Sequence, residues 1–450
     1  MARSASLFAC SSCGHESPKW HGRCPGCGEW NTLVEETRSP GPADGAGRSR
    51  SARALKPVAL GEVQAPRVGR LRTGIGELDR VLGGGVVPGS LVLIGGSPGI
   101  GKSTLTSGAL GNLAAAGRSV LYVSGEESAA QVKLRAQRLG PAALTVPIVA
   151  ETDLDSVLAT IEAERPEVCV VDSVQVLYDP ALSGSPGSVG QVREVAGRLM
   201  RVAKERSVAV ILVGHVTKEG SIAGPRVLEH LVDCVLSFEG ERERTYRTLR
   251  SLKNRFGSTS EVGVFEMNEH GLVEVEDASA RFVNEATHAP GSVVLCAMEG
   301  SRPLLVEVQA LVAPSELVPP RRVANGVDRN RLALVLAVLA RHGGAALGGS
   351  DVFVSVAGGV RVDEPGADLA IALALASAAR GTELGGEQPL AAFGELGLTG
   401  ELRHVGHADR RIAEARKFGL TNVLHPGERL STLRRALAAA GARSAPARAA

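Results

Sequence analysis

A glycine-rich loop between an apolar run and a helical pattern constrains the fold of this chain more than any other feature. Gly96-Ser97-Pro98-Gly99-Ile100-Gly101-Lys102-Ser103 follows Leu91-Val92-Leu93-Ile94 directly. This is the strand-loop-helix context of a P-loop, in which glycines let successive backbone N–H groups surround phosphates. Lys102 would reach the terminal phosphates, and the Ser103 hydroxyl suits Mg²⁺. We therefore expect the segment from Gly96 to Thr104 to bind ATP and Mg²⁺.

Length and composition set broad limits on the rest of the chain. A chain of 450 residues is too long for one ordinary core, so several domains are expected. Aromatic residues make up only 3%, which argues against widespread stacking of bases on aromatic rings. No apolar stretch reaches the ~18 residues that span a bilayer, and the N-terminus lacks an apolar signal core. We expect a cytoplasmic protein with no membrane partner.

The patterning predicts an α/β chain of five segments. Residues 67–276 alternate β-branched runs with helical stretches, which predicts a parallel sheet covered on both faces. Residues 277–440 predict an α+β domain. A cysteine module occupies residues 1–35, residues 36–66 are expected to be a flexible basic linker, and residues 441–450 a disordered tail. The linker could lie along a phosphate backbone or act as a solvated tether.

The strands expected in the first large domain are 91–95, 120–124, 168–172, 208–214, 234–238, 248–253 and 263–267, with helices at 104–116, 128–139, 154–164 and 192–205.

Four of the seven cysteines form two Cys-x-x-Cys pairs near the N-terminus: Cys10 with Cys13, and Cys24 with Cys27. Four thiolates in two pairs are the ligand set that a tetrahedral structural Zn²⁺ prefers. So short a segment cannot bury enough core by itself, so its folding should depend on zinc. We expect Trp20 and Trp30 to form a small core around the pairs, although DNA contact by the module stays open.

The other three cysteines lie singly among apolar residues and are expected to be buried and inert: Cys169, Cys234 and Cys296.

Acidic residues at predicted strand ends complete the candidate ATP site. Asp172 ends the apolar run 168–172, and a P-loop needs such an acid on a neighbouring strand to order Mg²⁺. Glu126 and Glu127 follow the strand 120–124, where a carboxylate could polarise the attacking water. We expect Glu126 to be this base, with Glu127 as the second candidate.

Several motifs resemble a known family. Residues 73–85 resemble the opening of RecA-type ATPases, and residues 214–220 are similar to their sensor region for the γ-phosphate. Together with the four-cysteine module, Lys253-Asn254-Arg255-Phe256-Gly257 resembles the RadA (Sms) family of bacterial DNA repair proteins. The resemblance covers nearly the whole chain. It implies a DNA-dependent ATPase of recombinational repair, with a hexameric ring that moves on single-stranded and branched DNA beside a RecA-type recombinase and promotes branch migration.

The resemblance also assigns roles to four cations. In ring-shaped relatives a Lys-x-Arg pair completes the neighbouring subunit's site, which implies that Lys253 and Arg255 stabilise charge in trans. The same two cations could instead bind DNA phosphates. RecA-like proteins place DNA-binding loops after the strands that end near residues 172 and 214, which makes Lys218 and Arg226 candidate DNA contacts.

The last large domain resembles the proteolytic domain of Lon over residues 363–370 and 394–402. Aligning those motifs puts Gly366 at the serine position and Asp409 at the lysine position of the catalytic dyad. Neither residue can do that chemistry. An inactive Lon-protease-like domain is expected, which would assemble the ring and extend a DNA-binding surface. The arginines that offer charge for such a surface are Arg302, Arg321, Arg322 and Arg329.

Two other function classes share part of this pattern: a filament-forming recombinase of the RecA class and an ATP-dependent protease.

Overall fold

A computed structural model of the chain describes residues 6–10, 15–26, 28–37, 58–62, 69–182, 184–214, 227–240, 246–268, 271–275, 277–284, 286–357, 360–386 and 388–441. The chain forms two compact units. One comprises Met1–Glu239, Leu249–Thr259 and Asn268–Val273, and the other comprises Gly240–Thr248, Ser260–Met267 and Glu274–Ala450.

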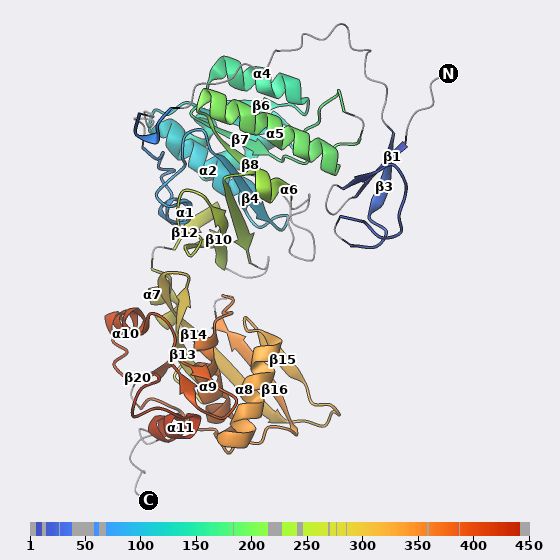
Figure 1. The fold of residues 1–450 in the computed structure, drawn as a ribbon. Coiled ribbons are helices and arrows are strands. Elements are labelled where there is room, and N and C mark those ends of the chain that lie inside the picture. The colour runs from blue at the N-terminus through green and yellow to red at the C-terminus, as the bar shows by residue number, and fades with distance from the viewer. Residues whose placement is uncertain are drawn as a thin grey trace, which may run out of the picture. The chain divides into compact units, whose positions relative to one another are not determined.

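Among the described residues, nine strands form one sheet in the order β12-β11-β10-β9-β4-β8-β7-β5-β6 (Figure 1). These strands are β4 (Leu91–Gly96), β5 (Val120–Ser124), β6 (Ile148–Ala150), β7 (Val168–Asp172), β8 (Ala209–Val213), β9 (Cys234–Glu239), β10 (Tyr246–Asn254), β11 (Val262–Asn268) and β12 (Gly271–Glu274). From β9 to β6 the neighbouring strands pair in parallel. All residues of β4, β5, β7 and β8 are buried, as expected when helices cover both faces.

The described helices of the first unit are α1 (Gly76–Leu82), α2 (Lys102–Ala115), α3 (Ala129–Leu139), α4 (Leu154–Glu164), α5 (Val189–Arg206) and α6 (Val227–Leu231), with 3₁₀ turns η1 (Leu60–Glu62) and η2 (Pro141–Thr145). On one face, α4 and α5 share a core with alternate residues of β4, β5, β7 and β8. The loop helix α2 packs against β4, β5 and β7. The expected α/β architecture is confirmed, and the expected strands and helices are present with ends shifted by at most three residues.

The N-terminal module is a small three-stranded sheet of order β2-β1-β3, made by β1 (Ser6–Cys10), β2 (Glu16–Ser17) and β3 (Leu33–Thr37). Its described core is Cys10, Cys24 and Leu33, with Phe8 packed against it.

The second unit holds a six-stranded sheet among its described residues, in the order β15-β16-β14-β13-β17-β20. Its strands are β13 (Ser292–Glu299), β14 (Arg302–Pro314), β15 (Arg322–Asn325), β16 (Ser350–Val356), β17 (Ala391–Ala392) and β20 (Val423–Leu424), and β18 (Glu395–Leu396) pairs with β19 (Leu402–Arg403). Its helices are α7 (Ala278–Asn284), α8 (Arg329–His342), α9 (Asp368–Arg380), α10 (Ala408–Lys417) and α11 (Leu433–Gly441), with the 3₁₀ turn η4 (Pro365–Ala367). Helix α9 is buried along most of its length against β13 and β14.

Within the described residues, no helix is both long enough and apolar enough to cross a bilayer.

The three isolated cysteines are buried, as expected. Cys169 and Cys296 have no exposed surface and Cys234 has almost none. Burial raises the pKa of each of these thiols to about 12. At neutral pH they are therefore protonated and shielded, which makes them unreactive.

Two glycines of α2 make a matched pair for testing how this helix packs. A Cβ on Gly111 would lie 3.0 Å from the backbone of Ala143 in η2, whereas a Cβ on Gly108 would have only Ile75 Cδ1 at 3.9 Å. An interior helix glycine costs about 0.5–1 kcal/mol relative to alanine. We expect Gly108→Ala to raise the free energy of unfolding by up to that amount, and Gly111→Ala to lower it by about 1–3 kcal/mol through overpacking. Denaturant unfolding measures both, and equal shifts would contradict this packing.

Thiol titration tests the burial of the three isolated cysteines. With a zinc chelator present, we expect an aromatic disulfide reagent at pH 8 to label only N-terminal thiols in the folded protein. All seven cysteines should react after unfolding in guanidinium. Circular dichroism shows that the chelated protein keeps its helices, and peptide mapping identifies the labelled residues. Rapid labelling of Cys169, Cys234 or Cys296 before unfolding would contradict the burial.

Candidate functional site

The P-loop joins the end of β4 to the start of α2. Gly99 and Gly101 have φ of 76° and 115°, a left-handed conformation that glycine adopts without strain. A Cβ on Gly96 would lie 2.8 Å from the carbonyl oxygen of Phe238 on β9, so a side chain there would push the strands apart. Backbone constraint therefore requires glycine at these positions, as a loop that wraps phosphate would.

Lys102 begins α2 with its side chain folded back over the loop. Its Nζ donates to the carbonyls of Gly96 at 2.8 Å and Ser97 at 3.1 Å. Burial lowers the pKa of Lys102, and the carboxylates of Asp172 and Glu126 oppose that shift. The fold thus brings these two acids, distant in sequence, into the electrostatic neighbourhood of the loop lysine.

Strand register explains how these residues meet. Ile94 of β4 pairs with Val213 of β8, Val213 with Asp172 of β7, and Asp172 with Ser124 of β5. The parallel strands therefore end at one level, and the segments that follow them share one edge. The expectation of a directly neighbouring strand was wrong, because β8 lies between β4 and the strand that carries Asp172.

The two glutamates after β5 have different partners. Glu127 forms an ion pair with Arg135 of α3, whose guanidinium also donates to the Tyr122 hydroxyl at 2.8 Å. Glu126 accepts a hydrogen bond from the buried hydroxyl of Ser173, which follows Asp172. The backbone between the strand and the glutamates is closely packed, since a Cβ on Gly125 would lie 2.2 Å from Val176.

Sequence reasoning missed Tyr122, whose hydroxyl donates to Asp172 Oδ2 at 2.6 Å. Its side chain is buried beneath the loop edge. The available signal was a phenol in the middle of the apolar strand 120–124, because a buried hydroxyl needs a partner.

The motif that begins at Lys253 contacts the turn between α6 and β9, at the end of the sheet where the parallel strands begin. Lys253 Nζ donates to the carbonyls of Glu229 and Val232 at 2.6 and 2.8 Å. Arg255 forms an ion pair with Asp233 at 2.9 Å, and Asp233 in turn accepts the backbone N–H of Leu91. Burial and then the Arg255 cation lower the pKa of Lys253. Both cations face the turn between α6 and β9, and Arg255 lies just past the end of β10.

The rest of this motif packs against helix α1. Asn254 Nδ2 lies 3.3 Å from the carbonyl of Leu82, and Gly257 packs against Gly83, whose added Cβ would meet it at 3.3 Å. The Phe256 side chain is partly exposed. Close backbone contact explains the glycine, so part of this motif serves the fold.

The P-loop and the Lys-x-Arg pair therefore lie at opposite ends of β4. Leu91, the first residue of β4, bonds to Asp233 beside Arg255, while Gly96, the last, bonds to Lys102. Six extended residues separate the two ends by roughly 17 Å. Neither Lys253 nor Arg255 is placed to touch phosphates in the P-loop of its own chain.

The N-terminal module presents half of its expected ligand set in two similar turns. The backbone N–H of Cys10 donates to the His15 carbonyl at 3.0 Å, and that of Cys24 donates to the Glu29 carbonyl at 2.8 Å. Both thiols are buried, and the backbone N–H of Gly26 points to the Cys24 sulfur at 3.3 Å. Backbone N–H groups directed at sulfur suit a metal-bound thiolate. Cys13 and Cys27 lie outside the described residues.

The expected role of the tryptophans was wrong. Trp20 and Trp30 are 55% and 71% exposed, so they do not build the core around the cysteines. Their rings both lie 3.7 Å from the position of a Cβ on Gly22. The described core is formed instead by Cys10, Cys24 and Leu33, with Phe8 packed against it.

The two positions expected for a protease dyad do not form a site. Gly366 is buried, and Asp409 is exposed in the first turn of α10. A Cβ on Gly366 would lie 3.1 Å from both Arg411 and Glu364. Those two residues form a bidentate ion pair in which Arg411 is buried and Glu364 partly buried. Arg411 also donates to the carbonyl of Cys296 at 2.7 Å. A structural ion pair therefore surrounds the position where a nucleophile would be needed.

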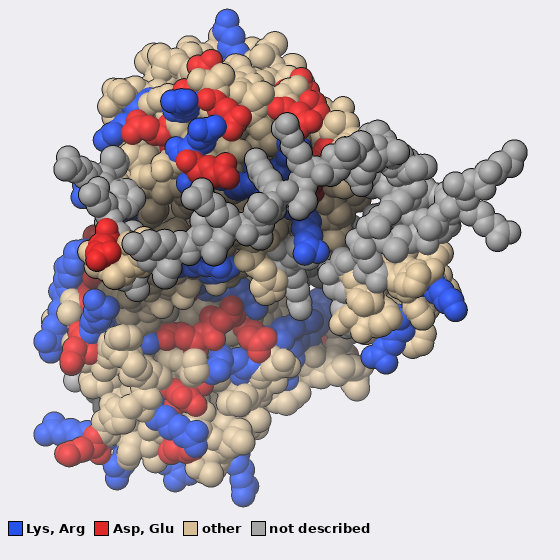
Figure 2. Space-filling model, turned by 45° about the horizontal axis from the view of Figure 1, so that its top comes forward, with Lys and Arg blue, Asp and Glu red and all other residues tan. Residues whose placement is uncertain are grey.

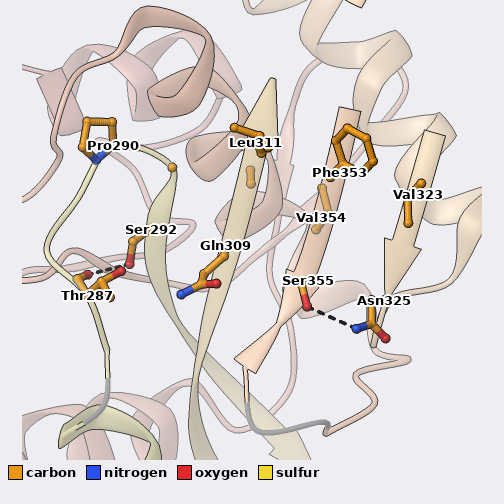
Figure 3. Close-up of a pocket in the computed structure, with 12 residues that line it drawn as sticks. Thr287, Pro290, Ser292, Gln309, Leu311, Val323, Asn325, Phe353, Val354 and Ser355 are labelled. Atoms are coloured by element: carbon orange, nitrogen blue, oxygen red, sulfur yellow. Dashed lines mark hydrogen bonds between the residues drawn. The ribbon is translucent and has the colours of Figure 1, made fainter. Parts of the chain in front are cut away.

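The open face of β14, β15 and β16 carries a shallow pocket of about 430 Å³ (Figure 3). One cross-strand row is apolar, with Leu311, Phe353 and Val323, and the next row is polar, with Ser355 hydrogen-bonded to Asn325. Lysine, histidine and cysteine are absent from its twelve lining residues. The pocket therefore lacks a base for serine chemistry.

Charges of both signs are interspersed over the face that Figure 2 shows, in keeping with a net charge of +2. Arg322 donates to the carbonyls of Leu347 and Ser350, which ties it to the turn before β16. Arg321 and Arg329 are exposed. The candidate DNA contacts Lys218 and Arg226 lie outside the described residues.

Comparison with known proteins is consistent with this geometry. A family model described as an AAA domain matches residues 59–221, and one described as a rubredoxin metal binding domain matches residues 8–35. The chain is 49% identical to the DNA repair protein RadA of Bacillus subtilis over 434 residues, which cover 96% of this chain and 94% of the relative. The identity is 50% to RadA of Brucella abortus over 93% and 91% of the two chains, and 46% to RadA of Listeria monocytogenes over 94% and 93%.

These matches confirm the resemblance found in the sequence. The AAA domain match spans the P-loop together with Glu126 and Asp172, and it makes this chain an ATPase with a nucleotide site. The chain belongs to the family of the DNA repair protein RadA.

Proposed function

We propose that this chain is a cytoplasmic DNA-dependent ATPase of recombinational DNA repair, which works as a hexameric ring on single-stranded and branched DNA. It promotes branch migration beside a RecA-type recombinase. The observation that carries the proposal is the distance between the P-loop and the Lys253–Arg255 pair, at opposite ends of β4. A site divided in this way is complete only when two copies meet, and a closed ring gives every copy a neighbour.

One half of the site comes from the chain's own P-loop edge. Lys102 binds the terminal phosphates, and Ser103 and Asp172 hold Mg²⁺, which neutralises phosphate charge when bound. These residues fit the ion, because Asp172 supplies a carboxylate close to the P-loop. The Tyr122 hydroxyl holds that carboxylate, and its charge opposes the lowering of the Lys102 pKa.

Glu126 is the residue proposed to polarise the attacking water. It lies close enough to Lys102 to oppose the lowering of the lysine pKa, whereas Glu127 is committed to an ion pair with Arg135. The ion pair engages the carboxylate that Glu127 would need to bind the attacking water. The pairing with Arg135 therefore favours Glu126 over Glu127.

The other half of the site comes from a neighbouring copy. Arg255 is 51% exposed, and its bond to Asp233 uses one of five N–H donors. Lys253 is anchored by two carbonyls and holds the turn in place beside it. In this arrangement Arg255 stabilises charge on the neighbour's nucleotide, and hydrolysis depends on assembly. Direct DNA contact by the pair is the alternative that the tests below separate.

Zinc binding by Cys10, Cys13, Cys24 and Cys27 is proposed to fold the N-terminal module. The buried Cys10 and Cys24 and their matching turns support this ligand set.

The first test asks whether DNA controls ATP turnover. We expect single-stranded DNA to stimulate hydrolysis and a forked substrate to be unwound, with neither activity in Lys102→Ala. Glu126→Gln should lower the rate about 10²–10⁴-fold, the usual contribution of a positioned base, and Glu127→Gln far less. Phosphate release and gel-resolved strand displacement measure these activities. ATP turnover that does not depend on DNA would contradict the proposed function, and a larger loss in Glu127→Gln than in Glu126→Gln would contradict the choice of base. Filaments in electron microscopy would favour a recombinase. Degradation of casein would favour a protease.

The second test mixes two inactive variants. Lys102→Ala lacks a working P-loop, and Arg255→Ala lacks the proposed finger. In mixed rings, the P-loop of an Arg255→Ala subunit meets the intact Arg255 of a Lys102→Ala neighbour, so we expect ATPase activity to reappear. Arg250→Ala, which removes a nearby β10 arginine paired with Glu239, is the matched control and should be active alone.

Mixtures that stay inactive, while native mass spectrometry shows mixed assemblies, would contradict action in trans. Normal DNA-free ATPase with weakened DNA binding in Arg255→Ala would instead assign the residue to DNA.

A further inference from the structure

A buried chain of hydrogen bonds joins α3 to the acid at the end of β7. Arg135 Nη2 donates to the Tyr122 hydroxyl at 2.8 Å, and that hydroxyl lies 2.6 Å from Asp172 Oδ2. The guanidinium carbon lies 5.9 Å from the centre of the tyrosine ring, and the same guanidinium pairs with Glu127. These contacts link the helix after the catalytic-base candidate to the acid assigned to Mg²⁺.

The direction of each hydrogen bond is fixed by chemistry. A guanidinium has only donors, so the phenol oxygen must accept from Arg135. The phenol has one proton, which is then left for the carboxylate of Asp172.

Burial makes this contact consequential. Tyr122 is 2% exposed and Asp172 is 7% exposed, so water is a poor substitute for the hydroxyl. With one carboxylate oxygen bound by the phenol, rotation of the Asp172 side chain is restricted and the other oxygen remains for the metal. Groups that orient a metal ligand in this way typically change metal affinity or activity by about 10–100-fold when they are removed.

We propose that Tyr122 is a positioning residue of the ATP site, which orients Asp172 toward Mg²⁺ through its hydroxyl, with Arg135 setting the direction of that hydrogen bond. The proposal rests on the assignment of Asp172 as the Mg²⁺-ordering acid. Tyr122 touches neither nucleotide nor reacting water in this role, and it acts only through the carboxylate.

Tyr122→Phe removes the hydroxyl and keeps the ring. The chain offers a matched control in Tyr246→Phe, because Tyr246 is also buried and its hydroxyl accepts from Arg281 at 2.8 Å in the other compact unit. The readout is binding of fluorescently labelled ADP, titrated with Mg²⁺ and repeated in EDTA. We expect Tyr122→Phe to need about tenfold more Mg²⁺ for half-maximal tight binding. Its affinity in EDTA should equal that of the unmodified protein, and Tyr246→Phe should match that protein in both conditions.

The outcomes separate this inference from the assignment on which it rests. An Asp172→Asn variant that shifts the Mg²⁺ requirement, beside a Tyr122→Phe variant that does not, overturns the role of Tyr122 alone. If neither variant shifts it, the Asp172 assignment fails as well. Equal losses with Mg²⁺ and in EDTA would show that Tyr122 only supports the fold, and would overturn the inference.

A second variant covers the case in which Tyr122→Phe does not fold. Arg135→Gln removes the guanidinium that sets the direction of the Tyr122 hydrogen bond but keeps the hydroxyl, so we expect a smaller shift in the same direction, clearly below that of Asp172→Asn. No shift, or one as large as that of Asp172→Asn, would mean that Arg135 does not act through the Tyr122 hydroxyl, and would overturn the inference.

Discussion

The register of the parallel sheet is the constraint on which the rest of this structure depends. Ile94, Val213, Asp172 and Ser124 lie at one level across β4, β8, β7 and β5. Because the strands are parallel, everything that follows them in sequence emerges at one edge. Moving β7 by one residue would turn Asp172 to the other face and break its bond to Tyr122. The P-loop therefore depends for its chemistry on residues that are 20 to 80 positions away in the sequence, such as Tyr122 and Asp172. Pairing of the parallel strands brings these residues close to the loop.

The same constraint sets the meaning of the motif at Lys253. Its cations are tied to the turn before β9, at the edge where the parallel strands begin, and this places them away from the P-loop of the same chain. A charge-stabilising role there requires a second copy. In the proposed role, the ion pair with Asp233 would hold Arg255 in position, since Asp233 itself accepts a hydrogen bond from the backbone of β4.

The second unit shows how a resemblance can persist without its chemistry. The Gly366 position is enclosed by the ion pair of Glu364 and Arg411, which also bonds to the carbonyl of Cys296. Arg411 is 2% exposed, so losing the Glu364 carboxylate would leave a buried guanidinium without this partner, which is costly. The ion pair therefore stabilises the fold around Gly366.

The local chemistry of the chain could be predicted from its amino-acid sequence. Glycine spacing identified the P-loop, Cys-x-x-Cys spacing the metal module, and β-branched runs the strands, because each depends on residues that are adjacent in the chain. Which partner each side chain contacts depends on the folded chain. It paired Glu127 with Arg135, gave Asp172 a hydroxyl donor and left Trp20 and Trp30 at the surface. Strand order and register arise from packing of the whole sheet, and no local pattern contains them.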